Sequence, residues 1–352
     1  IPYVSPAGLI SPTLTWETVV AKNVGLDFTI LNQKLDVSFD VYTRDTKDML
    51  MNVSYPDILG TAAPKSNAAD LRTKGWELSA TWHDKVGTNW NYGLTLALSD
   101  NTSKITRYLN PTGAIDQYYV GKDIGEIWAY ETVGIFQTEA DVAASANQDQ
   151  LGAAWKAGDM QYADLNKDDK ITPGVRTLDD HGDLRIVGNT TPRYSFGING
   201  DISYKGIGLN VFFQGVMKRD YLPDNGNWNA FYPYNDGHLE KYAISESWTE
   251  TNRDAYFAAP TFGYNTKKNI HPQSRYVQNA SYIRLKNLSV SYQFPVKLIQ
   301  KVRLNGAQIY FAGMNLWEAT KMHKPLDPES VFTVTQEYYL QRIFTLGVKL
   351  NF

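Results

Sequence analysis

Residues of alternating polarity recur along this chain. The last ten residues show the pattern most clearly, because one side carries only large apolar residues: Phe344, Leu346, Val348, Leu350 and Phe352. The other side carries polar residues and one glycine. Successive side chains of a β-strand point to opposite faces of a sheet, so this period of two predicts a strand with one apolar and one polar face.

Eight further segments show the same alternation and pair into four hairpins with short turns. The segments are 23–30 with 35–41, 76–82 with 90–98, 195–204 with 207–213, and 288–294 with 307–311. Long polar stretches lie between the hairpins, at about 46–72, 105–190, 218–278 and 319–338. Nine strands with short turns at one end and long loops at the other are typical of a transmembrane antiparallel β-barrel.

The strand count predicts only part of such a barrel. Single-chain bacterial barrels have even strand numbers, and an open sheet edge would leave backbone groups unpaired in hydrocarbon. We therefore expect the carboxy-terminal part of a larger barrel, with Ile1 as a boundary inside the full protein. No run of eighteen apolar residues exists, which excludes a helical membrane span.

Composition narrows the possible partners. The net charge of −3 and the lack of a Lys/Arg cluster argue against nucleic acid, and the absence of cysteine removes disulfides and thiolate chemistry. Tyrosine, with 23 residues, is the most frequent aromatic residue. This suits both the interfacial girdle of a membrane protein and a sugar-contacting surface.

Five segments, in order, resemble the SusC/RagA family of TonB-dependent outer-membrane transporters. They are Leu14-Thr-Trp-Glu-Thr-Val19 with Asn23-Val-Gly-Leu-Asp27; Tyr42-Thr-Arg-Asp-Thr-Lys-Asp-Met-Leu50; Asn279-Ala-Ser-Tyr-Ile-Arg-Leu-Lys-Asn-Leu288 with Tyr292-Gln-Phe-Pro295; Asn315-Leu-Trp317 with Asp327-Pro-Glu329; and the final Arg342 to Phe352.

The resemblance implies a 22-stranded barrel in the bacterial outer membrane, surrounded by lipid, with an amino-terminal plug and a TonB-contacting segment that this chain lacks. It further implies import of oligosaccharides or peptides with a SusD-like surface lipoprotein as a lid, and no enzymatic activity. The alternative is a soluble all-β carbohydrate-binding or hydrolytic module whose aromatic residues form a ligand surface.

An acidic turn provides a candidate cation site. Its oxygen ligands take positions 1, 3, 5 and 7 of an EF-hand-like loop: Asp164, Asn166, Asp168 and the Lys170 carbonyl. Calcium or magnesium prefers such ligands. The loop departs from the EF-hand at position 6, which is Asp169 instead of glycine, and at position 12, which is Val175.

The family resemblance supplies the missing acidic ligand. A similar loop in the family is followed by an acidic residue before an I-G-N-x-x-P segment, and that position falls on Asp183 here, with Asp179 and Asp180 as alternatives. A solvated acidic turn without a metal is the other interpretation.

An aromatic loop over 227–234 is a candidate substrate contact through Trp228, Phe231, Tyr232 and Tyr234. Aromatic faces stack on sugars or on peptide side chains. The same residues would also suit packing against a neighbouring subunit or within the loop itself.

Catalysis has no comparable candidate. The five histidines are scattered without the i, i+4 spacing of a helical zinc site, and the adjacent Asp179 and Asp180 lack an opposing carboxylate for glycoside hydrolysis.

Phe352 is a candidate assembly signal, because it places an aromatic residue at the end of an alternating strand. One ring contributes little to the apolar contacts of a large barrel. We therefore expect deletion of Phe352 to reduce the amount of protein in the outer membrane severely, while the inserted fraction stays heat-resistant. Protease shaving of intact cells measures the surface abundance, and equal abundance of variant and wild type would assign Phe352 to ordinary packing.

Overall fold

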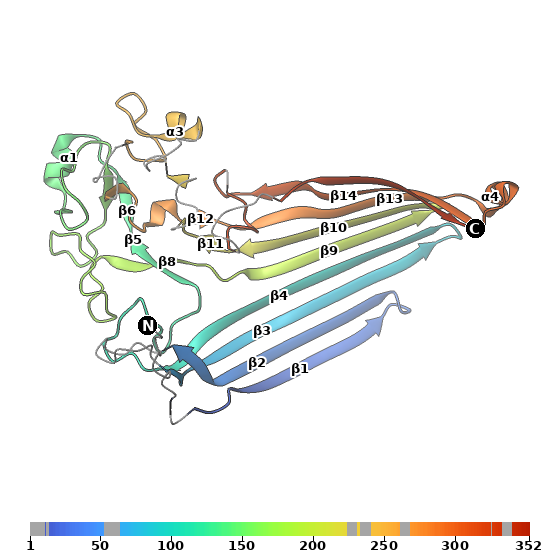
Figure 1. The fold of residues 1–352 in the computed structure, drawn as a ribbon, viewed down its shortest axis with the longest axis horizontal. Coiled ribbons are helices and arrows are strands. Elements are labelled where there is room, and N and C mark those ends of the chain that lie inside the picture. The colour runs from blue at the N-terminus through green and yellow to red at the C-terminus, as the bar shows by residue number, and fades with distance from the viewer. Residues whose placement is uncertain are drawn as a thin grey trace, which may run out of the picture.

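Nine long strands form one antiparallel sheet in the computed structural model (Figure 1), which describes residues 11, 14–52, 64–223, 231–232, 241–260, 268–324, 326–332 and 340–352. The strands are β1 Thr18–Ile30, β2 Leu35–Asn52, β3 Lys65–Val86, β4 Trp90–Tyr108, β9 Arg193–Tyr204, β10 Ile207–Lys218, β13 Tyr282–Gln293, β14 Gly306–Thr320 and β15 Ile343–Asn351. Each pairs with the next in this order, and β1 and β15 are the two edges. The nine predicted strands and their four hairpins are confirmed.

The register of the sheet separates an apolar from a polar face. Leu96 lies opposite Ala80 and Ile198, whereas its neighbour Thr95 lies opposite Thr81 and Asn199. Paired residues of adjacent strands point to the same side, so like residues form rows across the sheet. The residues Phe28, Leu94, Ile198, Val211 and Val348 fall on the apolar face, and Asp27, Thr95, Asn199, Asn210 and Lys349 fall on the polar face.

An aromatic row borders the apolar face next to the short turns. Trp90 stacks on Tyr204 with ring centroids 4.3 Å apart, and Tyr292 meets Phe294 edge to face at 5.0 Å. Amphipathic Trp and Tyr rings favour the boundary between hydrocarbon and water. The row therefore marks one margin of the band that the sheet presents to lipid.

Two tyrosines of the polar face lie directly over glycines of the adjacent strand. A Cβ atom at Gly347 would lie 2.3 Å from the Tyr310 ring, and one at Gly75 would lie 2.6 Å from the Tyr42 ring. A ring can cover the backbone this closely only where the neighbour has no side chain, so each pair fixes the register locally.

Strands β2, β3 and β4 continue beyond their alternating segments. Their extensions are cross-linked by charge, since Arg107 Nη2 lies 2.7 Å from Asp70 Oδ1 and 2.8 Å from Asp48 Oδ1. Alternation is required only where one face meets hydrocarbon, so these extensions lack the periodic signal. The predicted loop over 46–72 is consequently wrong in its bounds, and only 53–64 separate β2 from β3.

Short elements fill the long connections. They are β5 Glu126–Tyr130, β6 Thr132–Ile135, α1 Glu139–Ala144, β7 Met160–Tyr162, β8 Leu184–Asn189, β11 Asp220–Tyr221, α3 Lys241–Glu246, η3 Ser274–Tyr276 and β12 Gln278–Asn279, while α4 Val296–Ile299 and η4 Gln300–Val302 lie in the turn between β13 and β14. Figure 1 shows the first group gathered at one end of the sheet and α4 at the other. No helix within the described residues is long and apolar enough to cross a membrane.

The long connections fold together into one body, which we call the cap: the described parts of 109–192, 219–281 and 321–342. Its apolar core draws on all three connections, for example through Met160, Phe257 and Leu326, each at most 5% exposed. The sequence predicted long polar loops, whereas the structure shows a folded body with an apolar core. The sequence did not reveal this core because the apolar residues of the cap are scattered without a period and come together only in the folded protein.

An arginine is expected to destabilise the protein much more on one face of β4 than on the other. Leu94→Arg, midway along the apolar face, should destabilise the barrel in lipid by about 2–4 kcal/mol, because it places a charge in hydrocarbon. The adjacent Thr95→Arg should cost much less, since it faces the polar side. Unfolding in lipid vesicles measures both variants, and equal losses would show that the assignment of the faces is wrong.

Candidate functional site

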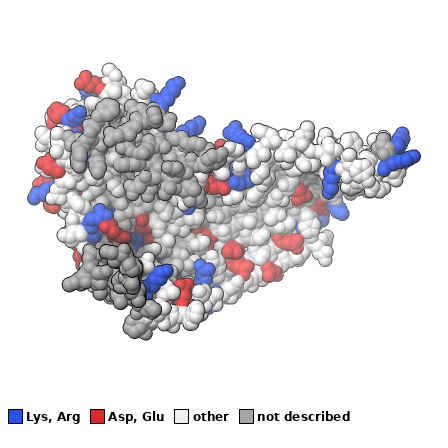
Figure 2. Space-filling model, in the orientation of Figure 1, with Lys and Arg blue, Asp and Glu red and all other residues white. Residues whose placement is uncertain are grey.

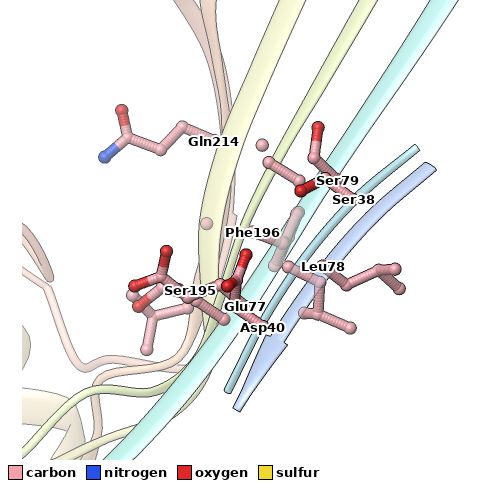
Figure 3. Close-up of a pocket in the computed structure, with 14 residues that line it drawn as sticks. Ser38, Asp40, Glu77, Leu78, Ser79, Ser195, Phe196 and Gln214 are labelled. Carbon is pink, nitrogen blue, oxygen red and sulfur yellow. The ribbon is translucent and has the colours of Figure 1, made fainter. Parts of the chain in front are cut away.

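The polar face contains a hollow of about 430 Å³ across β2, β3, β4, β9 and β10 (Figure 3). Figure 3 shows Asp40, Glu77 and Ser195 gathered in one part of it, with Ser38 and Ser79 further along the strands and Gln214 at the other side. The curvature of the sheet makes this possible, because it brings β2 and β10 to the same concavity although three strands separate them.

The chemistry of the hollow suits hydrogen bonding to a polar solute. It offers hydroxyl, amide and carboxylate groups, and its lining residues include no histidine, lysine or arginine. Asp40 Oδ1 accepts a hydrogen bond of 3.1 Å from Asn23 Nδ2, which orients the carboxylate across the strand pair.

The cap contains an aromatic cluster formed by Phe231, Tyr232, Phe257 and Tyr276. The Phe231 ring meets the other three edge to face, with centroids 5.0 to 5.8 Å apart. Phe231 is fully buried and Tyr232 is 4% exposed. Their burial favours packing within the loop region over substrate contact for these two residues. Trp228 and Tyr234 lie outside the described residues.

The side chains of the predicted cation turn form hydrogen bonds within the turn itself. Asp164 Oδ1 accepts from the Lys167 backbone N–H at 2.6 Å, and its Oδ2 accepts from that of Asp169 at 2.9 Å. Asn166 Nδ2 donates to Asp168 Oδ2 at 3.1 Å, and Asp168 Oδ1 accepts from the Lys170 N–H at 2.9 Å. The carboxylate oxygens of Asp164 and Asp168 are therefore held by hydrogen bonds within one tight turn, and oxygen ligands of this kind are the type that a hard cation prefers.

Asp183 lies next to this turn, and its role as a metal ligand stays a prediction. It is fully buried, and its two carboxylate oxygens accept from the backbone N–H groups of Leu165 at 2.8 Å and Thr172 at 2.7 Å. The alternatives Asp179 and Asp180 are exposed. Among the described residues, no three His, Asp or Glu side chains are grouped closely enough to hold a metal, so any cation would also need the amide and carbonyl ligands.

Burial changes the proton affinity of tyrosines elsewhere in the cap. Burial, together with the Glu126 carboxylate that accepts from its hydroxyl, raises the pKa of Tyr119 to about 12. Burial raises the pKa of Tyr130 to about 12 as well. Both phenols therefore keep their protons further into the alkaline range than an exposed tyrosine does.

An arginine cluster joins the cap to the sheet, and sequence reasoning missed it. Arg284 of β13 is 3% exposed and pairs with Glu318 of β14 and with Asp327 and Glu329 of the cap, at 2.6 Å for Asp327. Lys286 also pairs with Glu329 at 3.0 Å. Both partners stand in segments that resemble the family, but no local pattern predicts a contact across more than forty residues.

Phe352 is 88% exposed and follows β15, on the same face as Leu350. The carboxy-terminus lies at the short-turn end of the sheet (Figure 1). Nothing in the fold tests its role in assembly, which stays a prediction.

A sheet with one apolar face, an aromatic margin, long connections at one end and short turns at the other defines an outer-membrane β-barrel. Residues 3–316 match the family model described as TonB dependent receptor-like, beta-barrel. The chain belongs to this family, whose members are bacterial outer-membrane receptors and not enzymes.

Several known proteins are similar to the chain. TonB-dependent receptor P3 of Formosa agariphila is 26% identical over 96% of the chain and 34% of its own length. TonB-dependent receptor SusC of Bacteroides thetaiotaomicron is 24% identical over 96% of the chain and 32% of its length. The chain thus spans about a third of these relatives.

Solved structures share the fold. A structure of the RagAB peptide transporter superposes with a TM-score of 0.73 at 22% identity, covering 96% of the chain and 36% of the solved chain. The predicted barrel architecture, membrane location and SusC/RagA resemblance are confirmed, and the soluble alternative is not favoured.

Replacing Arg284 with an uncharged residue should loosen the attachment of part of the cap to the sheet. Arg284→Met leaves three carboxylates without their shared partner, and breaking a buried ion pair costs about 3–5 kcal/mol. Hydrogen exchange of residues 321–332 in the full-length protein should become faster accordingly. The exposed Arg342→Met is the control, and equal exchange in the two variants would show that the cluster does not hold the cap.

Proposed function

We propose that the chain forms part of the wall and the cap of a TonB-dependent importer for oligosaccharides or peptides. The main support is the hollow on the polar face, which offers hydrogen-bonding groups to a polar solute and lies on the side opposite to the apolar face. The RagAB structures, described as a peptide transporter, lend weight to peptides as one of the two substrate classes.

The plug, the TonB-contacting segment and the lipoprotein partner of the importer are proposed by analogy with the relatives. The chain covers 34% and 32% of two relatives, and we propose that a lumenal plug and a TonB-contacting segment belong to the part of the full protein outside this chain. A SusD-like surface lipoprotein is the proposed lid. The cap suits such a partner because its shared core makes the end of the barrel a preformed platform instead of a set of independent loops.

The large exposed apolar face argues against the second function, a soluble carbohydrate-binding or hydrolytic module. Phe344, Leu346 and Val348 are each more than 60% exposed in one strand. A soluble sheet would cover such residues with a second layer, whereas a barrel exposes them to lipid.

Uptake should depend on energy coupling through TonB. Cells with the full-length protein should accumulate labelled oligopeptides or oligosaccharides, and cells that lack either this protein or TonB should not. Accumulation that persists without TonB would contradict the proposed mechanism, and accumulation of neither class would contradict the proposed substrates.

We further propose that the 164–170 turn binds calcium. Asp164→Asn removes a charge and one of the two side-chain oxygens that accept from backbone N–H groups of the turn, so it should weaken calcium binding by roughly tenfold. Asp201→Asn, on the barrel wall, is the matched control. Calcium titration of the full-length protein measures both, and indistinguishable titrations for wild type and Asp164→Asn would remove this proposal.

A further inference from the structure

The short-turn end of the sheet differs in charge from the rest of the molecule. The four turns 31–34, 87–89, 205–206 and 294–305 contain five Lys or Arg residues and no Asp or Glu. Figure 2 shows Lys and Arg side chains, without visible acidic ones, at the tip that α4 forms in Figure 1, whereas acidic side chains are frequent over the cap. The short turns of this barrel therefore carry a net positive charge.

Four of these cations form what we call the basic turn surface: Lys205, Lys297, Lys301 and Arg303. None of them has an ion-pair partner among the residues that the structure describes, in contrast to Lys34, which pairs with Asp84 at 2.9 Å. These cations lie in the turns 205–206 and 294–305. The two turns are adjacent, because the Gln293 N–H at the end of β13 donates to the Gly206 carbonyl at 2.8 Å. The cations therefore belong to one region.

Exposed apolar residues alternate with these cations. Val296 and Leu298 are 54% and 55% exposed, while Ile299 between the basic residues is buried and anchors α4. Lys205 Nζ lies 5.2 Å from the centre of the Tyr204 ring, in the aromatic row. Such a mixture suits the membrane interface, where apolar side chains enter the acyl region and cations reach the phosphate level.

An apolar groove begins at Ile207, two positions after Lys205 of the basic turn surface. It has a volume of about 460 Å³ and lies on the lipid-facing side of β10, β13, β14 and β15, lined by Ile207, Val290, Tyr292, Ile309, Phe311 and Leu346. Ile207 directly follows the turn that carries Lys205. The lining residue Ile207 thus connects the groove to the turn that carries Lys205.

We propose that the basic turn surface and this groove together bind an anionic phospholipid, its phosphate at the cations and one acyl chain in the groove. Only an amphiphile combines both features, since a free phosphate leaves the groove empty and an acidic protein does not extend into the lipid-facing band. Basic residues next to a membrane surface attract anionic headgroups in this way. The proposal uses the membrane location of the barrel and does not depend on what it imports.

Native mass spectrometry of the full-length protein in neutral detergent tests the proposal. Wild type should retain phosphatidylglycerol in preference to phosphatidylcholine with the same acyl chains. The variant K205Q/K297Q/K301Q/R303Q should bind phosphatidylglycerol roughly tenfold more weakly, because it loses the headgroup contacts. The variant K156Q/K241Q/R253Q/K321Q removes the same charge from the cap and should behave as wild type.

Heat-dependent gel mobility confirms that both variants are folded. Equal retention in wild type and the turn variant would overturn the proposal, as would an equal loss in the cap variant, which would indicate a general charge effect. Displacement of the lipid by inorganic phosphate at the same concentration would also overturn it, because the site would then recognise an anion and not a lipid.

Discussion

Every backbone N–H and C=O group that crosses hydrocarbon must find a partner within the protein, and this constraint organises the whole chain. The nine strands meet it between β1 and β15, where each strand pairs with the next and the ladder of hydrogen bonds is continuous; the outer edges of β1 and β15 have no partner strand among the described residues. Because the backbone is satisfied in this way, side chains are free to serve two environments. One face became apolar, and the other could keep serines, amides and carboxylates.

The cap is organised by a different principle. Its three connections bury a common apolar core, and polar contacts between distant segments stabilise it: Lys268 Nζ lies 2.6 Å from Asp159 Oδ2, with both side chains at most 2% exposed, and Asn269 donates to the same carboxylate. A buried charge pair is costly when it is misaligned, so it favours one arrangement of the connections. Arg284 then attaches this body to β13.

The two ends of the barrel therefore offer different surfaces. At one end lies a folded cap with mixed charge, suited to contact with other macromolecules. At the other lies an aromatic row followed by unpaired cations, suited to the boundary of a lipid bilayer. The hollow on the polar face lies between them and is separated from lipid by the sheet itself.

The sequence by itself determined the strands, their pairing and their faces, because the period of two is local and hydrocarbon imposes it on every crossing. It also predicted the acidic turn as a cation site, because the ligand spacing is local, and the family resemblance pointed to Asp183 as a further ligand; both stay predictions, and the structure shows Asp183 accepting from the Leu165 N–H. Only the tertiary structure decided where β2 ends and where β3 begins, since strand segments outside the membrane need no alternation. It alone decided that Phe231 is buried, because an aromatic run looks the same whether it binds a ligand or fills a core. The contact of Arg284 with Asp327 is also tertiary, since it joins residues forty-three positions apart that only the folded cap brings together.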